Sequence, residues 1–162
     1  MHTQVFGWDI QPLSWEGILA ALFCGALVGV ERQYSGKPAG IRTSILVCLG
    51  SYGYVCLANF GTQEGDPTRI IGQVVTGVGF LGAGVMMTHH GNVLGVTSAA
   101  VIWVLAAMGA FIGMERFAPA VLISCLTLFV LVGINVIESR FKKSMQKGIH
   151  KHEEPDVDID DG

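Results

Sequence analysis

The chain has 162 residues, of which 51% are hydrophobic and only 14% are charged, and its formal net charge at pH 7 is −3. Its mean hydropathy is +0.52. The charged residues are absent from five long segments, so the chain lacks the polar stripe that each helix of a soluble bundle presents to water. The composition therefore excludes a soluble helical bundle.

The uncharged segments have the length of membrane spans. Asp, Glu, Lys and Arg are absent from residues 17–30, 43–60, 70–88, 96–113 and 118–137. A bilayer core about 30 Å thick requires roughly 20 mostly apolar helical residues, and the first segment reaches this length when it is extended back to Leu13. We therefore predict an all-α, polytopic membrane protein, a bundle of five transmembrane helices at about 13–30, 43–60, 70–88, 96–113 and 118–137.

The basic residues predict how this bundle is oriented. Three of them lie in the loop 31–42 and five in residues 138–162, whereas Arg69 and Arg116 lie on the opposite side. The positive-inside rule places the more basic side in the cytoplasm. We expect the N-terminus outside and the C-terminus in the cytoplasm, with 138–162 as a disordered tail that is basic and then acidic.

The third segment contains a literal G-x-G-x-x-G, from Gly77 to Gly82. A dinucleotide site requires a strand before this motif and an acidic residue about 20 positions after it, and neither is found. On a helix, Gly72, Thr76, Gly79 and Ala83 instead share one face, because their spacing is +4, +3 and +4. Small residues at this spacing allow another helix to approach closely.

Two other segments carry the same kind of small-residue seam, Gly25-x-x-x-Gly29 and Gly109-x-x-x-Gly113. We expect these seams to pack inside the bundle; the alternative is a seam between two copies of the chain or a lined conduit. The predicted helix-packing residues are Gly25, Gly29, Gly72, Gly77, Gly79, Gly82, Ala83, Gly84, Gly109 and Gly113.

Several polar residues stand at the edges of the third segment. Asp66 and Pro67 form an expected N-cap and first helical residue; a cation bound at Asp66 is the alternative. Arg69 lies in the first turn, where the helix dipole disfavours a cation, so it is expected to pair with Asp66 or Glu64. Gln73 is expected to form a hydrogen bond across helices.

The loop 31–42 contains Glu31, Arg32, Lys37 and Arg42. These residues satisfy the orientation rule, which is one sufficient explanation for them. Because Glu31 directly follows an apolar segment, where ionisable groups often pair or mark a site, a Glu31–Arg42 pair or an anionic partner is the alternative.

The chain offers no assembled acid, base and nucleophile, so no enzyme is expected. All four cysteines lie in apolar segments and none forms C-x-x-C, which predicts neither a disulfide framework nor a zinc site. No cofactor is expected, apart from Mg²⁺, for which Asp66 is a candidate ligand.

Three stretches resemble the MgtC/SapB membrane-protein family. They are GALVGVERQYSGKPAGIRT (25–43), DPTRIIGQVVTGVGFLGAGVM (66–86) and GVTSAAVIW (95–103). The resemblance implies a small polytopic protein of the bacterial inner membrane, linked to growth in low magnesium, to virulence in pathogens, and to control of the F-type ATP synthase and the membrane potential. Carried over by motif, the functional polar positions are Glu31, Arg32, Lys37, Arg42, Asp66, Arg69 and Gln73. Longer members carry a soluble C-terminal domain, and residues 138–162 are too few and too charged to form one.

Two classes of function follow. The first is a regulatory membrane protein that binds another membrane complex, such as the F-type ATP synthase, through its seams and its cytoplasmic loop. The second is a transporter or channel for Mg²⁺ or another ion, with Asp66 and Glu31 at opposite mouths. Membrane lipids and further copies of the chain are expected partners, and nucleic acid is not.

Overall fold

The fold is a helical bundle with two very short strand pairs. A computed structural model describes residues 4–5, 8–60, 67–89 and 92–149. In chain order these ranges form β1 (Gln4–Val5), β2 (Trp8–Asp9), α1 (Trp15–Tyr34), α2 (Ile41–Phe60), α3 (Pro67–Val85), β3 (Met87–His89), β4 (Asn92–Leu94), α4 (Val96–Gly113) and α5 (Phe117–Ile149). Each strand pair is antiparallel. The prediction of an all-α chain with five helices is confirmed over these ranges.

Four of the helices are long and apolar enough to cross a membrane: Ile41–Phe60, Thr68–Val85, Val96–Gly113 and Phe117–Ile134. These correspond to the second to fifth predicted spans. Helix α1 has 20 residues but is not among the four, because its last turn carries Glu31, Arg32 and Gln33. By helix composition, the chain is a multi-pass membrane protein.

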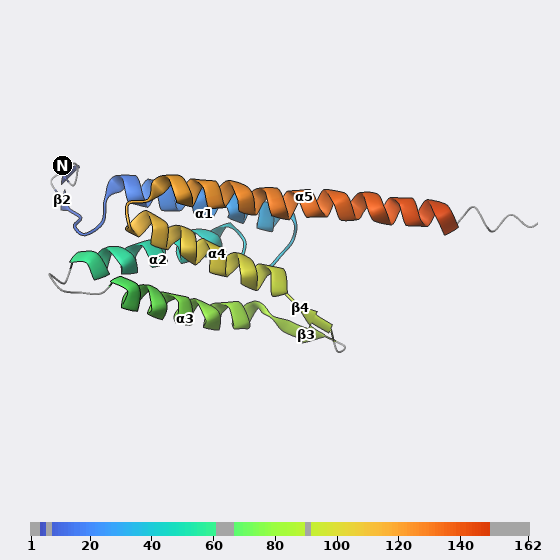
Figure 1. The fold of residues 1–162 in the computed structure, drawn as a ribbon, viewed down its shortest axis with the longest axis horizontal. Helices are drawn as coiled ribbons and strands as arrows, with labels where there is room; N and C mark the ends of the chain where they lie inside the picture. The colour runs from blue at the N-terminus through green and yellow to red at the C-terminus, as the bar shows by residue number, and fades with distance from the viewer. Residues whose placement is uncertain (1–3, 6–7, 61–66, 90–91, 150–162) are drawn as a thin grey trace, which may run out of the picture.

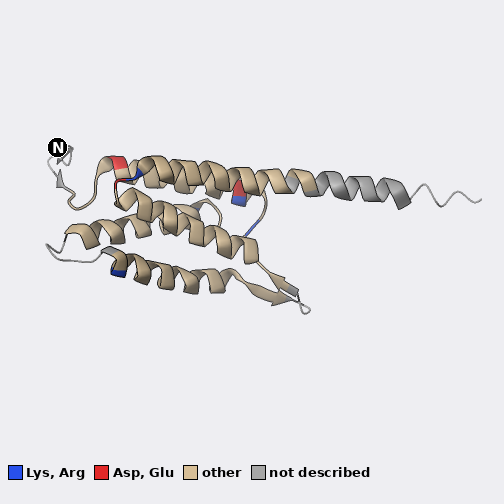
Figure 2. Ribbon diagram, viewed as in Figure 1, with Lys and Arg blue, Asp and Glu red and all other residues tan. Residues whose placement is uncertain are grey.

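The helices lie side by side and alternate in direction along the bundle (Figure 1). The turn between α4 and α5 and the start of α3 lie at the end of the bundle nearer the N-terminus. The loop 35–40 and the β3–β4 hairpin lie toward the other end, and α5 projects beyond it. In α1 to α4 and the loops between them, the coloured Lys, Arg, Asp and Glu residues lie at helix ends and in loops, and the middles of α2, α3 and α4 contain none (Figure 2).

Helix α2 is central. It packs most extensively against α1 and α4, whereas α3 lies at the edge of the bundle, against α4 and to a lesser extent α2. The large side chains that are fully buried come mainly from α1, α2 and α4 and include Val28, Tyr52, Val55, Leu105, Met108 and Ile112. On α3, Val78 is the one buried hydrophobic side chain among the residues described.

Glycines explain why α1 and α4 lie so close to α2. A Cβ added at Gly25 would lie 2.7 Å from the Cα of Ile45, and one at Gly113 would lie 2.7 Å from the Cβ of Val55. Gly29 and Gly109 are equally tight, against the backbone at Ile41 and Cys48. The Gly25/Gly29 and Gly109/Gly113 seams therefore contact α2 inside the bundle.

Helix α1 continues past its predicted end at residue 30. Its end at Tyr34 is closed by a Schellman motif, in which Lys37 N–H donates to Arg32 C=O at 3.0 Å and Gly36 N–H to Gln33 C=O at 3.1 Å. Gly36 has φ +61°, a conformation that glycine adopts without penalty. The loop between α1 and α2 is therefore only 35–40, shorter than the predicted 31–42.

The C-terminal ends of two further helices differ from the prediction. Helix α3 ends at Val85 rather than at residue 88, and the β3–β4 hairpin follows, with His89 paired to Asn92. A two-residue connection that contains glycine is typical of a hairpin, and the neighbouring Thr88 and Val93 are β-branched. Helix α5 extends from the predicted end at residue 137 to Ile149, because residues 138–147 contain neither Gly nor Pro and consist mostly of good helix formers. Residues 150–162 of the expected tail lie outside the described ranges.

Candidate functional site

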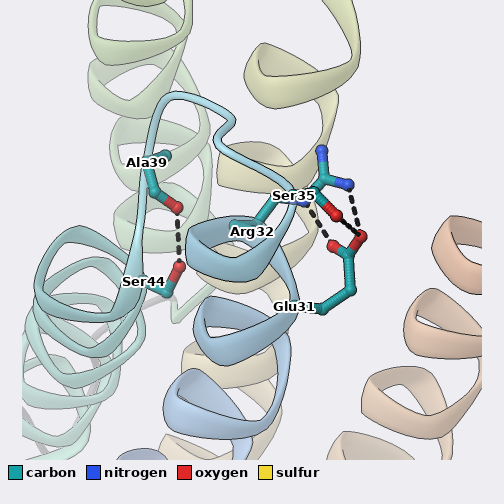
Figure 3. Close-up of polar contacts among 5 residues, drawn as sticks. All are labelled: Glu31, Arg32, Ser35, Ala39 and Ser44. Carbon is teal, nitrogen blue, oxygen red and sulfur yellow. Dashed lines mark hydrogen bonds and ion pairs between the residues drawn. The ribbon is translucent and has the colours of Figure 1, made fainter.

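The polar residues at the end of α1 form a buried ion pair (Figure 3). Arg32 Nε donates to Glu31 Oε2 at 2.6 Å, and Arg32 Nη2 donates to Glu31 Oε1 at 3.0 Å. The Arg32 side chain is only 2% exposed and that of Glu31 only 8%. The two charges are thus removed from water together, and the bidentate geometry supplies the partner that each one requires.

Glu31 thus pairs with its neighbour Arg32 and not with Arg42, the partner that the sequence offered as an alternative. Because α1 extends to Tyr34, Glu31 and Arg32 are both helical, and Ser35 lies one turn after Glu31, where its hydroxyl donates to Oε1 at 2.8 Å. The Arg32 guanidinium holds the pKa of the Glu31 carboxyl below its ordinary value; partial burial opposes this effect, and the Ser35 hydroxyl supports it. Arg42 is exposed at the start of α2.

The loop 35–40 is held by side chains from both neighbouring helices. Ser44 is buried and its hydroxyl donates to the Ala39 carbonyl at 3.2 Å (Figure 3). Gln33 Oε1 accepts a hydrogen bond from Ile41 N–H at 3.4 Å. Lys37 is exposed in this fixed loop. Glu31, Arg32 and Lys37 of the predicted set therefore lie in one region, and Arg42 lies just beyond it.

The second candidate site is the glycine face of α3. An added Cβ would meet nothing within 4 Å at Gly72, Gly77, Gly79 or Gly84. We expected this face to pack inside the bundle, but α3 turns a different face inward. Val78 is buried, and a Cβ added at Gly82 would lie 3.6 Å from the Cβ of Ala99 on α4. Valine side chains offer a neighbouring helix more contact area than glycines do, which favours this orientation.

Ala83, which shares a face with Gly72 and Gly79, is also exposed. Thr76 stands on the same face, and its hydroxyl donates back to the Gly72 carbonyl at 2.9 Å. That bond satisfies the hydroxyl within its own helix, so the stripe of Gly72, Thr76, Gly79 and Ala83 is small and has little polarity, with the exposed Phe80 beside it. The stripe resembles the seams of α1 and α4, but no described helix packs against its glycines.

The remaining predicted residues surround the start of α3. Gln73 lines an apolar cavity of about 640 Å³ between α2 and α3, together with Gly77, Ser51 and Tyr54. No hydrogen bond joins its side chain to any residue in the described ranges, so the expected bond across helices is not seen. Arg69 is exposed, and its expected partners Glu64 and Asp66 lie outside the described residues, as does the candidate metal ligand Asp66. Within the described ranges, no three His, Cys, Asp or Glu side chains are grouped as metal ligands.

Sequence reasoning missed the link between Ser14 and Tyr52 near the start of α1. Ser14 N–H donates to the Tyr52 hydroxyl oxygen at 2.8 Å, and the Ser14 hydroxyl caps α1 by accepting from Gly17 N–H at 3.0 Å. Serine before an apolar helical segment is an N-cap signal, but the partner 38 residues away gives none. This link joins the first helix to the central one.

The sequence comparisons identify relatives for most of the chain. The model of the MgtC family matches residues 18–140. The chain is 41% identical over 141 residues to the "Putative magnesium transporter YhiD" of Escherichia coli K12, an alignment that covers 82% of this chain and 64% of that protein. It is 39% identical over 117 residues to the protein MgtC of Salmonella typhimurium LT2, an alignment that covers 70% of this chain and 50% of that protein. It is 35% identical over 114 residues to the protein MgtC of Brucella abortus, an alignment that covers 70% of this chain and 47% of that protein.

The chain thus spans between about half and two thirds of the length of these relatives. No solved structure matches it. The family match extends from the first turn of α1 into the far part of α5 and includes both candidate sites. This chain belongs to the MgtC family.

Proposed function

We propose that this chain is a regulatory protein of the bacterial inner membrane, not an enzyme, and that it acts by binding another integral membrane complex through α3. The observation that carries the proposal is the open glycine face of α3, defined by Gly72, Thr76, Gly79 and Ala83, where a Cβ added at Gly72 or Gly79 would meet nothing within 4 Å. Lipid tails are as apolar as a helix surface, so close approach of small residues is a main source of helix association in a bilayer. This face offers that approach to an outside helix.

The other two seams of the chain supply an internal comparison. The glycines of α1 and α4 are in contact with α2, and α3 carries the seam that remains. Helix α3 also stands at the edge of the bundle, so a partner helix can reach it without displacing another element. The F-type ATP synthase is the partner that the family resemblance implies, in cells adapting to low magnesium or, in pathogens, during infection; a second copy of this chain is the alternative occupant.

The orientation belongs to the same proposal. The loop 35–40 and the far part of α5 lie toward the same end of the bundle (Figure 1), and both regions carry basic residues in the sequence. The positive-inside rule then places this end in the cytoplasm and the N-terminus outside. Labelling single cysteines introduced at Lys37 and Gly7, from either side of intact cells, tests this assignment.

Replacing Gly79 by leucine tests the proposal directly. The new side chain has open space in the monomer, so the chain should insert and fold normally, but it blocks close approach of a partner. The matched control is Gly133→Leu on α5, where an added Cβ also meets nothing within 4 Å. We expect ATP synthase subunits to co-purify equally with the wild-type chain and with Gly133→Leu. With Gly79→Leu their amount should fall about tenfold or more, which corresponds to a loss of about 1.4 kcal/mol or more of binding free energy.

Two readouts distinguish the occupants of the face. ATP-driven proton pumping in inverted membrane vesicles reports on the synthase, and co-purification of two differently tagged copies reports on self-association. If Gly79→Leu loses self-association but keeps capture of the synthase, the occupant of the α3 face is a second copy of this chain and not the synthase. Equal capture and equal pumping for Gly79→Leu and Gly133→Leu would contradict the role of the α3 face.

Ion transport is the second candidate, and the name of the YhiD relative, "Putative magnesium transporter YhiD", favours it. Sealed proteoliposomes that contain only this purified chain test it, with empty liposomes as the control. Saturable, protein-dependent Mg²⁺ entry that falls in Asp66→Asn would support transport. If folded, inserted protein gives no Mg²⁺ entry, transport is contradicted and the regulatory proposal remains.

A further inference from the structure

One nitrogen of the buried Arg32 guanidinium has no partner in the described structure. Its Nε and Nη2 are bonded to Glu31, whereas Nη1 is buried without a hydrogen-bond acceptor among the described residues. In Figure 3 this terminal nitrogen points away from Glu31. A buried charged donor without a partner is costly and unusual in a folded protein, so this nitrogen is available to an acceptor that enters the space beside it.

Arg32 lines a cavity of about 640 Å³ toward the end of the bundle where the loop 35–40 lies. Its walls come from the loop 35–40, the β3–β4 hairpin, the first turn of α4 and one stretch of α5. Lys37 contributes a second cation to the lining. No Asp or Glu of the described residues lines the cavity, and Glu31 is fully engaged with Arg32 and Ser35.

The first turn of α4 adds donors to the same cavity. Gly95 is the N-cap residue, has φ +88° and provides no side-chain cap, and the first intrahelical bond runs from Ala99 N–H to the Gly95 carbonyl at 2.9 Å. The N–H groups of Val96, Thr97 and Ser98 are therefore free of intrahelical acceptors. All three residues line the cavity, and the start of a helix attracts an anion through its dipole.

We propose that this cavity binds a phosphate group. A phosphate presents several acceptor oxygens at once, which suits donors that arrive from Arg32 Nη1, from Lys37 and from the start of α4. The opposite wall is apolar, with Val130, Leu131 and Ile134 of α5. Such a wall fits an acyl chain, so the phosphate of an anionic phospholipid and free phosphate are the two sources. The proposal goes beyond the regulatory function and does not depend on it.

Heat unfolding of the purified full-length chain in maltoside micelles tests this site. The probes are inorganic phosphate, compared with chloride at equal ionic strength, and dioctanoyl phosphatidylglycerol, compared with dioctanoylglycerol, which lacks the phosphate. A ligand that binds only the folded state raises the unfolding midpoint, and the rise grows with the logarithm of the ratio of ligand concentration to Kd. Stabilisation by inorganic phosphate identifies free phosphate as a sufficient ligand, and stabilisation by the phospholipid alone identifies the lipid headgroup.

Three variants connect the response to the cavity. Arg32→Gln should weaken the apparent Kd about tenfold or more, because it removes the buried charged donor. Lys37→Gln should weaken it about threefold, because Lys37 is exposed and its charge is partly screened. The matched control is Arg42→Gln, which removes an exposed cation of the same region that does not line the cavity, and its Kd should stay within about twofold of the wild type.

If Arg32→Gln does not fold, Lys37→Gln carries the test, since the loss of an exposed side chain leaves the bundle intact. A response to neither probe would overturn the proposal. So would equal weakening by Lys37→Gln and Arg42→Gln, since that result would show general attraction to basic residues and not a site.

Discussion

Replacing Gly109 by alanine adds one methyl group at the closest contact between α4 and α2. The new Cβ would lie 2.8 Å from the Cβ of Ser51 and 2.9 Å from the amide nitrogen of Tyr52, whereas ordinary van der Waals contact begins at 3.4 Å. It would lie closer still to the carbonyl oxygen of Cys48. The neighbours of this Cβ are mostly backbone atoms, so no side-chain rotation relieves the contact and the two helices must separate.

The expected loss is about 2 kcal/mol. Overpacking a well-packed core costs about 1–3 kcal/mol, and separation of the helices also weakens the contacts of Gly113 with α2. Alanine recovers about 0.8–1 kcal/mol of this through its higher helix propensity. The matched control is Gly79→Ala on α3, which gains the same propensity and meets nothing within 4 Å. Gly79→Ala should therefore be as stable as the wild type or more stable, by up to about 1 kcal/mol.

Both variants can be measured by unfolding the purified chain from maltoside micelles with increasing dodecyl sulfate, with helicity followed by circular dichroism. The free energy of unfolding should fall for Gly109→Ala and remain or rise for Gly79→Ala. Equal stability of the two variants would refute the assignment of one glycine to the interior and the other to an open face.

Two other substitutions probe the ends of the helices. Glu31→Gln should lower the free energy of unfolding by about 2 kcal/mol at pH 7, since it leaves the buried Arg32 without its counter-ion. Because the pKa of Glu31 is lowered in the folded state, this stabilisation is complete above the unfolded pKa of about 4.3 and is lost as the pH falls below it. The unfolding midpoints of the wild type and Glu31→Gln, measured over a pH series, should therefore converge in acid. Glu115→Gly should raise the free energy of unfolding by about 1 kcal/mol. Glu115 has φ +61° just after α4, and glycine adopts this conformation without a steric penalty. An unfolding midpoint equal to or below that of the wild type would contradict this prediction.

The sequence was sufficient for the number of helices and for most of their bounds, because lipid-spanning helices exclude charge. The segment 96–113 coincides with α4, and 43–60 falls within α2. Two of the helix ends where the prediction failed, those of α1 and α5, lie in polar sequence, whereas α3 ends early in the apolar sequence before the β3–β4 hairpin. Helices α1 and α5 continue through charged residues that are good helix formers, and a charge-free count stops before them.

The sequence also located the small-residue seams but could not show which of them are filled. The seams of α1, α3 and α4 have the same local pattern, and their difference lies in which helix stands opposite. That depends on long-range packing, in this case on the central position of α2. In the same way Arg32 was expected as part of a loop, and its burial against Glu31 became visible only when the continuation of α1 placed both residues on a helix.

The open glycines of α3 lead to a final prediction. A glycine inside a helix costs about 0.5–1 kcal/mol relative to alanine, so Gly72, Gly77, Gly79 and Gly84 together cost about 2–4 kcal/mol. Among the described residues, no close contact that needs the missing side chain offsets this cost, because an added Cβ would meet nothing within 4 Å. Changing all four to alanine should stabilise the isolated chain by about that amount in micelles. If a partner helix uses the space of the missing side chains, the same variant should lose capture of the ATP synthase. A variant that is more stable and still binds its partner at wild-type level would show that these glycines do not form the docking face.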